Sequence, residues 1–391
     1  MRASSEPRAV VVGGGIAGLA AAASLVRSGW RTRVFEQAPS FSELGAGLAV
    51  TENGRRALAA IGVGEVLERD GHRIRPAGTQ FMDGSWLMKL PGDDAGNTRM
   101  YGMHRQRLHS ALLDAAADAD LSTGMRVVDI DPGNADQQAV VVVETPDGEQ
   151  RVAADLVVGA DGVRSHLRNA LLPERTIVPS GYTSWRAIIP AADPVTGEFA
   201  MIWGPHAEFG ALPVGHGELY WYGYAKCSPG TDFLDESAAV RERFADWHDA
   251  AQFLIADTEP DRLLRHDVWV LDKPLKSYVR GRTIVIGDAA HPMLPTLGQG
   301  ANSALEDGVT VGRLIPSQTA DVPAALHEVD NQRRRRTQGL VRQSAAMARI
   351  GPHLGPGWKQ RVRNAAFRGV PRGLAQRSGG SFLNWQVPHH T

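Results

Sequence analysis

Two segments of the chain, one near each end, share a pattern of apolar strand, glycine- or acid-bearing turn and alanine-rich helix. The first runs from Arg8 to Leu25 and the second from Thr283 to Gly308. A turn of this kind lets the backbone approach a phosphate closely, because glycines remove obstructing side chains and the following helix begins with unpaired N–H groups. Two such turns predict an α/β fold in which both ends of the chain hold one large, extended ligand.

The glycines of the first segment have the spacing GxGxxG. Gly13, Gly15 and Gly18 lie between a predicted buried strand and a predicted helix. Gly13 permits the tight turn, Gly15 leaves room for a pyrophosphate, and Gly18 allows the helix to pack closely on the strand. Glu36 ends the next predicted strand, where a carboxylate can accept hydrogen bonds from both hydroxyls of a ribose. We therefore predict a dinucleotide site; a structural turn without a ligand is the alternative.

The second segment carries an acid at a strand end and then a glycine-rich turn. Asp288 follows the predicted strand 283–287, and from there a carboxylate can reach a ribose or polyol hydroxyl. The turn offers backbone N–H groups that can bind an anionic or electron-rich ring edge. These N–H groups belong to Gly298, Gln299, Gly300 and Ala301. A third turn of this type holds Asp161 and Gly162, and three turns are more specific than one.

Composition argues against several other kinds of protein. Lys and Arg number 42 against 43 Asp and Glu, a net charge of -1, so the charge balance does not favour nucleic acid or an anionic membrane as a partner. The single cysteine, Cys227, excludes an intrachain disulfide and a multi-cysteine metal site, and we expect no metal. No segment has the uncharged length of a membrane span, and the N-terminus has no apolar signal region. We expect a cytoplasmic protein.

Two further features have competing interpretations. Arg333 to Arg336 form a run of like charge in a predicted helix. We predict a solvated helix surface there, with packing against the sheet or contact with a cofactor phosphate as the alternative. His291 is predicted to order its loop by hydrogen bonding, because no partner histidines or acids lie at metal-ligand spacing.

The character of the sequence changes along the chain. Short aromatic strands punctuated by Gly and Pro predict an inserted, mainly antiparallel β-sheet domain at 76–100 and 181–267. The remainder is predicted to form a Rossmann-like nucleotide-binding domain with C-terminal helices, at 1–75, 101–180 and 268–391. Within it we predict a loop at 41–50, helix to about Ala348, and an irregular basic segment from there to Thr391.

Together these motifs resemble the flavoprotein aromatic hydroxylases, the single-component FAD monooxygenases typified by p-hydroxybenzoate, salicylate and 3-hydroxybenzoate hydroxylases. The resemblance extends over nearly the whole chain and rests on GGGIAGL with Glu36, MHRQRL, GADGVRS and GDAAHPMLPTLGQGANSALEDG. It implies an enzyme in which NADH or NADPH reduces FAD, and the reduced flavin captures O2 as a C4a-hydroperoxide. The product is a hydroxylated aromatic or heteroaromatic small molecule. We expect a monomer or a homodimer.

The resemblance also implies roles for individual residues. The ADP half of FAD is bound by Gly13, Gly15, Gly18 and Glu36. Arg105 contacts the flavin side, and Asp288 binds the ribityl chain. The isoalloxazine ring lies against Pro295, Gly298, Gln299 and Gly300. Asp161 and Gly162 are associated with both FAD and the transiently bound nicotinamide cofactor.

The sequence departs from these relatives in the middle sheet. Where 3-hydroxybenzoate hydroxylases place a histidine and a tyrosine before a proline, the stretch EFGALPV places Glu208 and Leu212 before Pro213. His206 is nearby, but in the wrong register. For a phenolic substrate, a base that takes the hydroxyl proton would help, yet no catalytic residue can be assigned.

We predict that Leu212, Tyr222 and Pro295 line the substrate pocket. Tyr220, Tyr222 and Tyr224 alternate along one predicted strand and therefore share a sheet face, which either lines this pocket or packs against a helix. If that strand faces away from the flavin, the pocket lies around Trp185, Arg186 and Trp203. Arg186 either meets a substrate carboxylate or pairs with a surface acid at a strand end.

Two other functions remain open at this point. An apolar pocket on the same flavin scaffold would suit epoxidation or reduction of an isoprenoid or polyene. A non-enzymatic flavin-binding redox module is the other possibility. The ring-contacting loop from Pro295 to Gly300 argues against it, because a module that only holds the nucleotide would not need such a loop.

Overall fold

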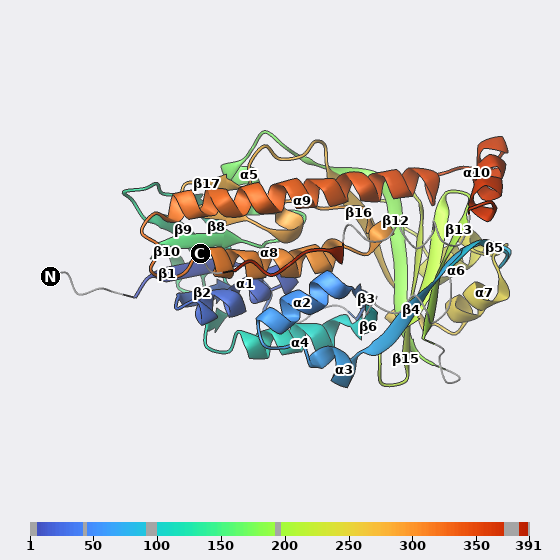
Figure 1. Cartoon of the computed structure of the whole chain (residues 1–391), viewed down its shortest axis with the longest axis horizontal. Helices are drawn as coiled ribbons and strands as arrows, with labels where there is room; N and C mark the ends of the chain where they lie inside the picture. The colour runs from blue at the N-terminus through green and yellow to red at the C-terminus, as the bar shows by residue number, and fades with distance from the viewer. Residues whose placement is uncertain (1–5, 42–44, 91–99, 192–196, 371–382, 390–391) are drawn as a thin grey trace.

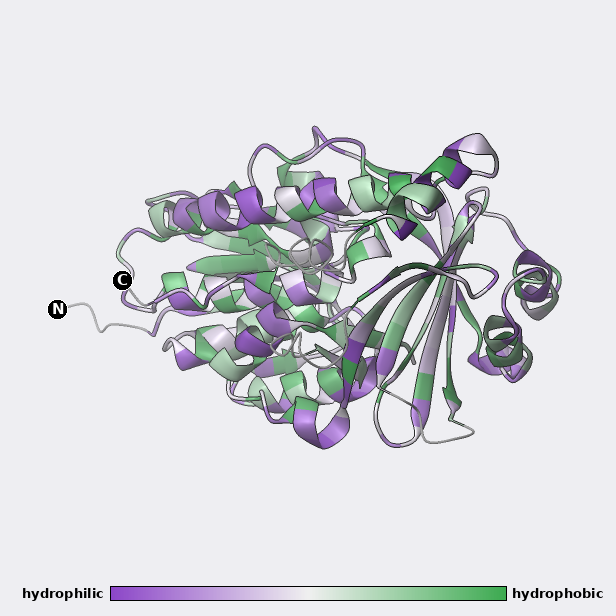
Figure 2. Ribbon diagram, turned by 45° about the vertical axis from the view of Figure 1, so that its right-hand side comes forward, coloured by the Kyte–Doolittle hydropathy of each residue, from purple (hydrophilic) through white to green (hydrophobic). Residues whose placement is uncertain are grey.

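The computed structural model describes residues 6–41, 45–90, 100–191, 197–370 and 383–389. Two large sheets dominate the fold, and the long helix α9 (Val322–Ile350) runs past both of them (Figure 1). Helices cover the first sheet, while the second sheet stands between the first and a pair of short helices (Figure 2). The predicted α/β fold with a second, mainly antiparallel sheet is confirmed.

The first sheet has six strands in the order β17-β18-β11-β1-β2-β7. They are β1 (Arg8–Val12), β2 (Arg31–Phe35), β7 (Asp120–Ser122), β11 (Leu156–Gly159), β17 (Val279–Arg280) and β18 (Thr283–Val285). All neighbours are parallel except β17 and β18. Nearly every residue of β1, β11 and β18 is apolar and buried, as expected for a parallel sheet covered on both faces.

Helices α1 (Ile16–Arg27) and α8 (Gly300–Leu314), which follow the two nucleotide-type turns, pack directly on each other. Gly308 and Gly312 permit this close approach. A Cβ atom on Gly308 would lie 2.5 Å from the backbone nitrogen of Ala21, and one on Gly312 would lie 2.3 Å from Ser24 Oγ. The two ends of the chain therefore form one packed unit, so the two turns are held in a fixed relation.

The second sheet has nine strands. Eight form the order β16-β12-β15-β14-β13-β4-β6-β3, and β5 pairs with β4. The pair β13 and β4 is parallel and the other neighbours are antiparallel. The strands are β3 (Gly47–Val50), β4 (His72–Phe81), β5 (Trp86–Lys89), β6 (Met100–His104), β12 (Ile177–Pro190), β13 (Glu198–Gly204), β14 (Ala207–Pro213), β15 (Glu218–Lys226) and β16 (Leu264–Leu271).

The two faces of the second sheet have different partners. One face packs against α6 (Glu236–Arg243) and α7 (Asp249–Ala256) in an apolar cluster that includes Trp185, Phe209, Trp221, Phe244 and Trp247. Strand alternation puts Tyr220, Tyr222 and Tyr224 on the opposite face, where Tyr220 and Tyr222 join a separate cluster with Leu212. The prediction that the three tyrosines share a face is confirmed.

The remaining elements complete the layers. A three-stranded sheet consists of β8 (Arg126–Asp131), β9 (Ala139–Thr145) and β10 (Gly148–Ala154). The other helices are α2 (Glu52–Ala60), α3 (Val66–Asp70), α4 (Arg105–Ala115), α5 (His166–Leu171) and α10 (Trp358–Arg368).

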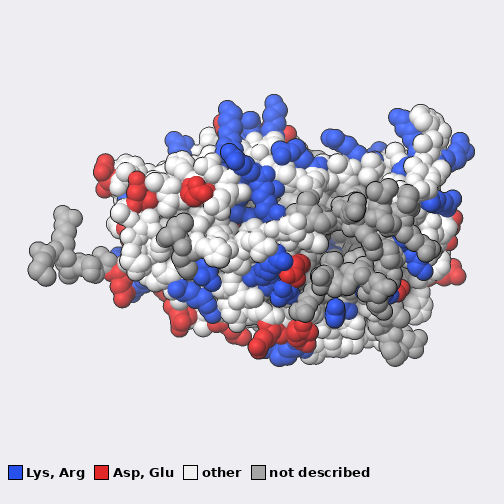
Figure 3. Space-filling model, viewed as in Figure 1, with Lys and Arg blue, Asp and Glu red and all other residues white. Residues whose placement is uncertain are grey.

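Lys and Arg gather along the edge of the molecule where α9 and α10 run (Figure 3). Within the described ranges, no helix combines the length and apolar character needed to cross a bilayer.

Three local predictions were wrong. Gly47–Val50, predicted as part of a loop, is strand β3, because it pairs with β6. The middle stretch contains α6 and α7 as well as strands. Residues 358–368, predicted to be irregular, form α10, which buries Gln360 and Arg363; residues 371–382 and 390–391 lie outside the described ranges. The predicted domain boundaries stay a prediction: β4 runs across the boundary at 75, and 91–99 are not described.

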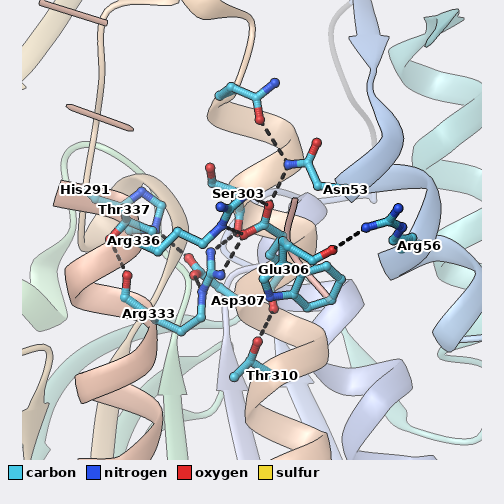
Figure 4. Close-up of polar contacts among 12 residues, drawn as sticks. Asn53, Arg56, His291, Ser303, Glu306, Asp307, Thr310, Arg333, Arg336 and Thr337 are labelled. Carbon is cyan, nitrogen blue, oxygen red and sulfur yellow. Dashed lines mark hydrogen bonds and ion pairs between the residues drawn. The ribbon is translucent and has the colours of Figure 1, made fainter. Parts of the chain in front are cut away.

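A buried ion cluster joins α8 to α9 (Figure 4). Arg333 donates from Nη1 to Glu306 Oε2 and from Nε to Asp307 Oδ1, each at 2.6 Å. Arg336 donates from Nε to Glu306 Oε2 at 2.6 Å. The side chains of Arg333 and Glu306 are 3% and 0% exposed. The predicted solvated surface is therefore wrong for Arg333 and correct for Arg335, which is exposed.

The members of this cluster stabilise one another in their charged forms. Burial alone would raise the pKa of Asp307, but His291 and Arg333 lower it well below its ordinary value. Burial alone would lower the pKa of Arg333, but Asp307 and Glu306 raise it above its ordinary value. Removing one partner would leave an uncompensated charge in a dry site, which is more costly than the loss of a surface pair.

We predict that Arg333→Met lowers the free energy of unfolding by about 3–5 kcal/mol, because Glu306 and Asp307 would stay buried without their main counter-charge. The matched control is Arg335→Met, two residues along the same helix and exposed, which should change that free energy by less than about 0.5 kcal/mol. Urea unfolding followed by circular dichroism measures both. Equal stabilities of the two variants would contradict the structural role given to Arg333.

Candidate functional site

Several of the predicted cofactor residues meet at the carboxyl edge of the first sheet. Four adjacent strands, β18, β11, β1 and β2, run parallel. Each is followed by one of the predicted turns, which carry Asp288, Asp161, Gly13 and Glu36. In open parallel sheets this edge is where ligands bind. Residues far apart in the sequence are therefore brought side by side.

The first turn has the backbone geometry that its glycines predict. Gly13 has φ of 104°, and a Cβ there would lie 2.4 Å from the carbonyl oxygen of Ala160. A Cβ on Gly18 would lie 1.9 Å from the carbonyl oxygen of Gly13. Gly15 is the N-cap of α1, and no side chain caps the helix there. The turn therefore presents the backbone of a helix N-terminus, which suits an anion.

Glu36 is held close to this turn by backbone donors. Its Oε2 accepts a hydrogen bond from the N–H of Gly14 at 2.7 Å, and its Oε1 accepts one from Ala38 at 2.8 Å. A carboxylate oxygen can accept a second hydrogen bond, so this geometry leaves Glu36 able to bind a ribose hydroxyl. His109 of α4, which the sequence analysis missed, contacts the carbonyl oxygen of Gly14 through Nε2 at 2.7 Å.

The other two acids at this edge have different surroundings. Asp161 Oδ2 accepts a hydrogen bond from the N–H of Leu167 at 3.0 Å. Its Oδ1 is buried without a partner among the described residues. Asp288, in the short 3-10 helix η3 (Gly287–Ala289), is exposed. An exposed carboxylate and an unsatisfied buried oxygen at one ligand-binding edge both fit a polar ligand that supplies donors.

The second glycine turn presents backbone rather than side chains. Pro295 and Gly298 are exposed, and Gly298 adopts a left-handed conformation with φ of 61° at the end of η4 (Pro295–Leu297). Leaving out a glycine's own chain neighbours, no atom of the described part of the chain lies within 4 Å of a Cβ built on Gly298 or Gly300. The space above this backbone is open, and α8 begins directly after it. A flat ring can approach the N–H groups here without meeting a side chain.

The side chain of Gln299 points inward, away from this open space. It is 0% exposed, donates from Nε2 to Thr51 Oγ1 at 3.1 Å and accepts from Asn53 Nδ2 at 3.0 Å. Asn302 accepts from the N–H of Thr51 and donates to the carbonyl oxygen of Gly298, at 3.0 and 2.9 Å. These contacts tie the turn to β3 and α2. No local sequence signal pointed to Thr51, Asn53 or Asn302.

His291 orders the loop before this turn, as predicted. Its Nε2 lies 2.5 Å from Asp307 Oδ2, and both side chains are 2% exposed. The same Asp307 oxygen accepts a hydrogen bond from the N–H of Gly287 at 2.9 Å. The ion cluster of α8 and α9 therefore extends to the turn that carries Asp288.

These observations fit FAD as the ligand. The glycine turn and Glu36 suit its ADP half, and Asp288 and the open backbone from Gly298 suit its ribityl chain and ring. Gly162, with φ of 76°, has open space where a Cβ would point. Side chains at these glycines would fill the cradle, which explains why it is lined by backbone at these positions.

The tyrosine face of the second sheet is linked to the predicted cofactor turns through β3, whose Ala49 accepts a hydrogen bond from Asn302 of α8. Tyr220 packs on Gly47 of β3, where a Cβ would be 2.3 Å from the tyrosine ring. Leu212 packs on Gly102 of β6, where a Cβ would be 2.8 Å from Leu212 Cδ1. Arg105, at the start of α4, is close enough to interact electrostatically with Tyr220. Leu212 is 3% exposed and packs against β6 of the same sheet.

Arg186 and Trp185 lie on opposite faces of β12. Arg186 is half-buried on the tyrosine face, with Nη2 2.8 Å from His266 Nδ1. It lies inside β12 opposite Tyr222, and not at a strand end as one of its two alternative interpretations supposed. Trp185 packs in the cluster under α6 and α7 and donates to Glu236 Oε2 at 2.8 Å. Of these two residues, only Arg186 is on the side of the cofactor edge.

One carboxyl on the tyrosine face was noticed in the sequence but given no role. Glu208 is 3% exposed and accepts hydrogen bonds from Tyr222 Oη and Trp203 Nε1, each at 2.9 Å. Burial raises its pKa to about 7, against the opposing effect of the hydrogen bonds from Tyr222 and Trp203. A buried carboxyl that titrates near neutrality is a candidate acid or base.

Known proteins agree with this site. A family described as FAD binding domain matches residues 6–344. Aurachin C monooxygenase/isomerase of Stigmatella aurantiaca is 34% identical over 348 residues, covering 88% of this chain and 89% of the relative. 6-Hydroxynicotinate 3-monooxygenase of Pseudomonas fluorescens is 33% identical over 354 residues, covering 85% and 89%.

A solved structure extends the comparison to three dimensions. Klebsiella pneumoniae HpxO, complexed with FAD and uric acid, matches with a TM-score of 0.85 and 27% identity, and the match covers 96% of each chain. The sequence resemblance and the prediction of FAD are thereby confirmed. With a family match over most of its length and relatives above 30% identity, the chain belongs to the FAD-dependent aromatic monooxygenases.

Proposed function

We propose that this enzyme hydroxylates a small aromatic or heteroaromatic ring that bears an ionisable hydroxyl or ring N–H group, with NADH or NADPH as reductant and O2 as oxidant. The observation that supports the proposal is the tyrosine face, which carries Glu208 and Arg186. It packs through Tyr220 on β3, the strand that Asn302 links by hydrogen bonds to the open backbone at Gly298. Relatives whose names refer to 6-hydroxynicotinate and uric acid support a substrate of this kind.

The cofactor roles are assigned by turn. We infer that Gly13, Gly15, Gly18 and Glu36 hold the ADP half of FAD. Asp288 binds the ribityl chain, while Asp161 and Gly162 serve both FAD and the nicotinamide cofactor. Arg105 lies on the flavin side. The ring rests on Pro295 and on the backbone of Gly298, Gln299, Gly300 and Ala301.

Bound FAD supplies the hydride acceptor and the oxygen-activating ring, so the chain needs no nucleophile of its own. The protein's part is to bind, orient and exclude water. N–H groups at the start of α8 can stabilise negative charge that develops at the ring edge. Tyr222, Leu212 and Pro295 enclose the substrate, and their apolar surfaces keep water from the reacting atoms.

Two properties of the whole protein are inferred more broadly. The single cysteine, Cys227, fits a reducing compartment, and we infer that the enzyme works in the cytoplasm. We infer a monomer or a homodimer, since the candidate site is built from one chain. Sedimentation equilibrium of the purified protein decides between these two states.

We predict that Asp288→Ala weakens FAD binding about 10- to 150-fold, because a charge-assisted hydrogen bond contributes about 1.5–3 kcal/mol. Asp161→Ala should weaken it less, since Asp161 also caps a backbone N–H in the protein. Asp136→Ala, in an exposed loop, is the control. Fluorescence titration of the apoprotein with FAD gives the three affinities. Wild-type affinity in Asp288→Ala would remove Asp288 from the site.

We predict that one member of a panel of 6-hydroxynicotinate, uric acid, salicylate and 4-hydroxyquinoline stimulates NAD(P)H oxidation, with equal consumption of O2 and a product heavier by one oxygen atom. Labelled oxygen from ¹⁸O2 should appear in the product. A polyene such as squalene serves as the negative control. Substrate-dependent NAD(P)H oxidation that needs no O2 would instead indicate a reductase and contradict the proposal.

A further inference from the structure

One buried carboxyl in the second sheet has neutral hydrogen-bond partners. The two oxygens of Glu208 accept from the hydroxyl of Tyr222 and from the indole N–H of Trp203, and among the described residues these are the side-chain donors to it. Burying a carboxylate without a counter-ion is costly. Apolar packing would stabilise this position better, so the carboxyl needs an explanation other than stability.

The geometry connects Glu208 to the candidate pocket through Tyr222. Gly210 lies opposite Tyr222 in the pairing of β14 with β15. A Cβ on Gly210 would be 2.6 Å from Tyr222 Cε1 and 2.7 Å from its Oη. The ring therefore lies across Gly210, and its hydroxyl reaches Glu208, two residues away on β14. Tyr222 is half-buried and neighbours Tyr220, with ring centroids 6.1 Å apart.

We propose that Glu208, acting through Tyr222, receives the proton that the substrate's ring hydroxyl or ring N–H group gives up during hydroxylation. This inference rests on the proposed function and identifies the base that it lacks. Tyr222 is the residue that touches the substrate, and Glu208 is a positioning residue behind it. The substrates that fit are rings with an acidic O–H or N–H, because a ring without one has no proton to give.

The proton transfer balances without any further reactant. The O–H or N–H bond of the substrate breaks, and its proton bonds to Tyr222 Oη. The proton that Tyr222 carried passes to Glu208 Oε1 along the hydrogen bond already present. The carboxylate becomes a carboxylic acid, Tyr222 is unchanged, and the substrate becomes an anion. Its ring carbons are then more electron-rich, which favours oxygen transfer to carbon.

The titrating groups around Glu208 come from several elements. Tyr222 and Tyr224 of β15 interact with Glu208 itself. Further out, and in contact with those tyrosines, with Trp203 or with one another, are Tyr220 of β15, Tyr182 and Arg186 of β12, His266 of β16, His206 before β14, His353 after α9 and Arg363 of α10. Burial, with Glu208, keeps the pKa of Tyr222 well above its ordinary value. Burial, with nearby positive charge, lowers the pKa of His353 to about 4. Burial lowers the pKa of Arg363 to about 10.

The sign of the expected pH dependence follows from Glu208. Because its pKa is raised to about 7, the carboxylate that can accept a proton accumulates as pH rises through that value. Turnover of a hydroxylated or N–H substrate should therefore rise with pH up to a plateau above about pH 8, and fall about tenfold per unit well below pH 7. The pKa values of His206 and His266 are lowered from 6.5, mainly by burial. These histidines would therefore titrate at a lower pH than this rising limb of the pH profile of turnover.

Glu208→Gln tests the proposal directly, since glutamine keeps the size of the side chain and cannot accept the proton. With 6-hydroxynicotinate, or the panel compound that the wild type turns over fastest, we expect kcat about 100-fold lower and the limb near pH 7 lost, with flavin content unchanged. Tyr222→Phe should behave alike, and the double variant should lose no more than either single one. A Glu208→Gln enzyme with the wild-type limb and kcat within twofold of wild type would overturn the proposal.

Tyr224→Phe is the matched control. Tyr224 lies on the same strand and face, but its hydroxyl is 2.8 Å from His353 Nε2. It should keep the pH limb of the wild type, because Glu208 and Tyr222 are untouched. If Tyr224→Phe loses the limb near pH 7 as Glu208→Gln does, any polar change on this face would remove the limb. That outcome would contradict a specific proton relay through Tyr222 to Glu208.

A second measurement needs no turnover. 4-Nitrophenol, whose anion absorbs visible light, is titrated with oxidised holoenzyme at pH 7.5. We expect saturable binding with a larger anion fraction than in solution for the wild type and Tyr224→Phe, and neutral phenol bound to Glu208→Gln. Absence of binding to the wild type, or equal anion fractions in all variants, would overturn the role of Glu208. If no panel compound turns over, the proposed function fails, while this measurement still decides on Glu208.

Discussion

The contact on which the site depends is the buried ion cluster between α8 and α9. Glu306 and Asp307 lie in the second turn of α8, and Arg333 of α9 pairs with both. Since unpaired charges cannot stay in a dry interior at small cost, the two helices are fixed in register. Asp307 extends this constraint to the N–H of Gly287, next to Asp288, and Glu306 extends it to Asn53, with Nδ2 at 2.5 Å from Oε1. The ion cluster therefore supports two predicted cofactor turns from the protein interior: the turn at Asp288 through Gly287, and the turn at Gly298 through Asn53 and Gln299.

This support explains why the cofactor turn can consist of open backbone. The side chain of Gln299 forms hydrogen bonds with Thr51 and Asn53, and Asn302 donates a hydrogen bond to the carbonyl oxygen of Gly298. The N–H groups at the start of α8 then face outward in a fixed arrangement, without a side chain that could discriminate among substrates. Under the proposed function, discrimination among substrates falls to the tyrosine face of the second sheet. The cofactor edge and the substrate face can therefore vary independently in sequence.

The parts of the fold and site that could be predicted are those determined by neighbouring residues. Gly13 and Gly18 are required by the turn in which they lie, so their spacing sufficed, as did the alternation of Tyr220, Tyr222 and Tyr224. The rest depends on partners far away in the sequence. In the sequence alone, Arg333 is one of four consecutive arginines expected on the surface, and only the packing of α9 on α8 shows that it is buried. Asn53 belongs to no motif, and only the fold places Gln299 beside it. Strand β3 was missed because its partner, β6, fixes its conformation.

Glu306 and Glu208, the two buried glutamates among the described residues, show how the surroundings of a carboxyl decide whether its role is structural or chemical. Glu306 is surrounded by cationic donors, since Arg333 and Arg336 both reach it, and its charge is needed to hold two helices together. Glu208 is equally inaccessible but meets only the neutral donors Tyr222 and Trp203 among the described side chains. Nothing there stabilises the anion as strongly, so its pKa lies at about 7 and it can exchange a proton at physiological pH. A carboxyl in that state contributes little to holding the sheet together, whereas a hydroxylase whose substrate must lose a proton needs such a group behind the wall of its pocket.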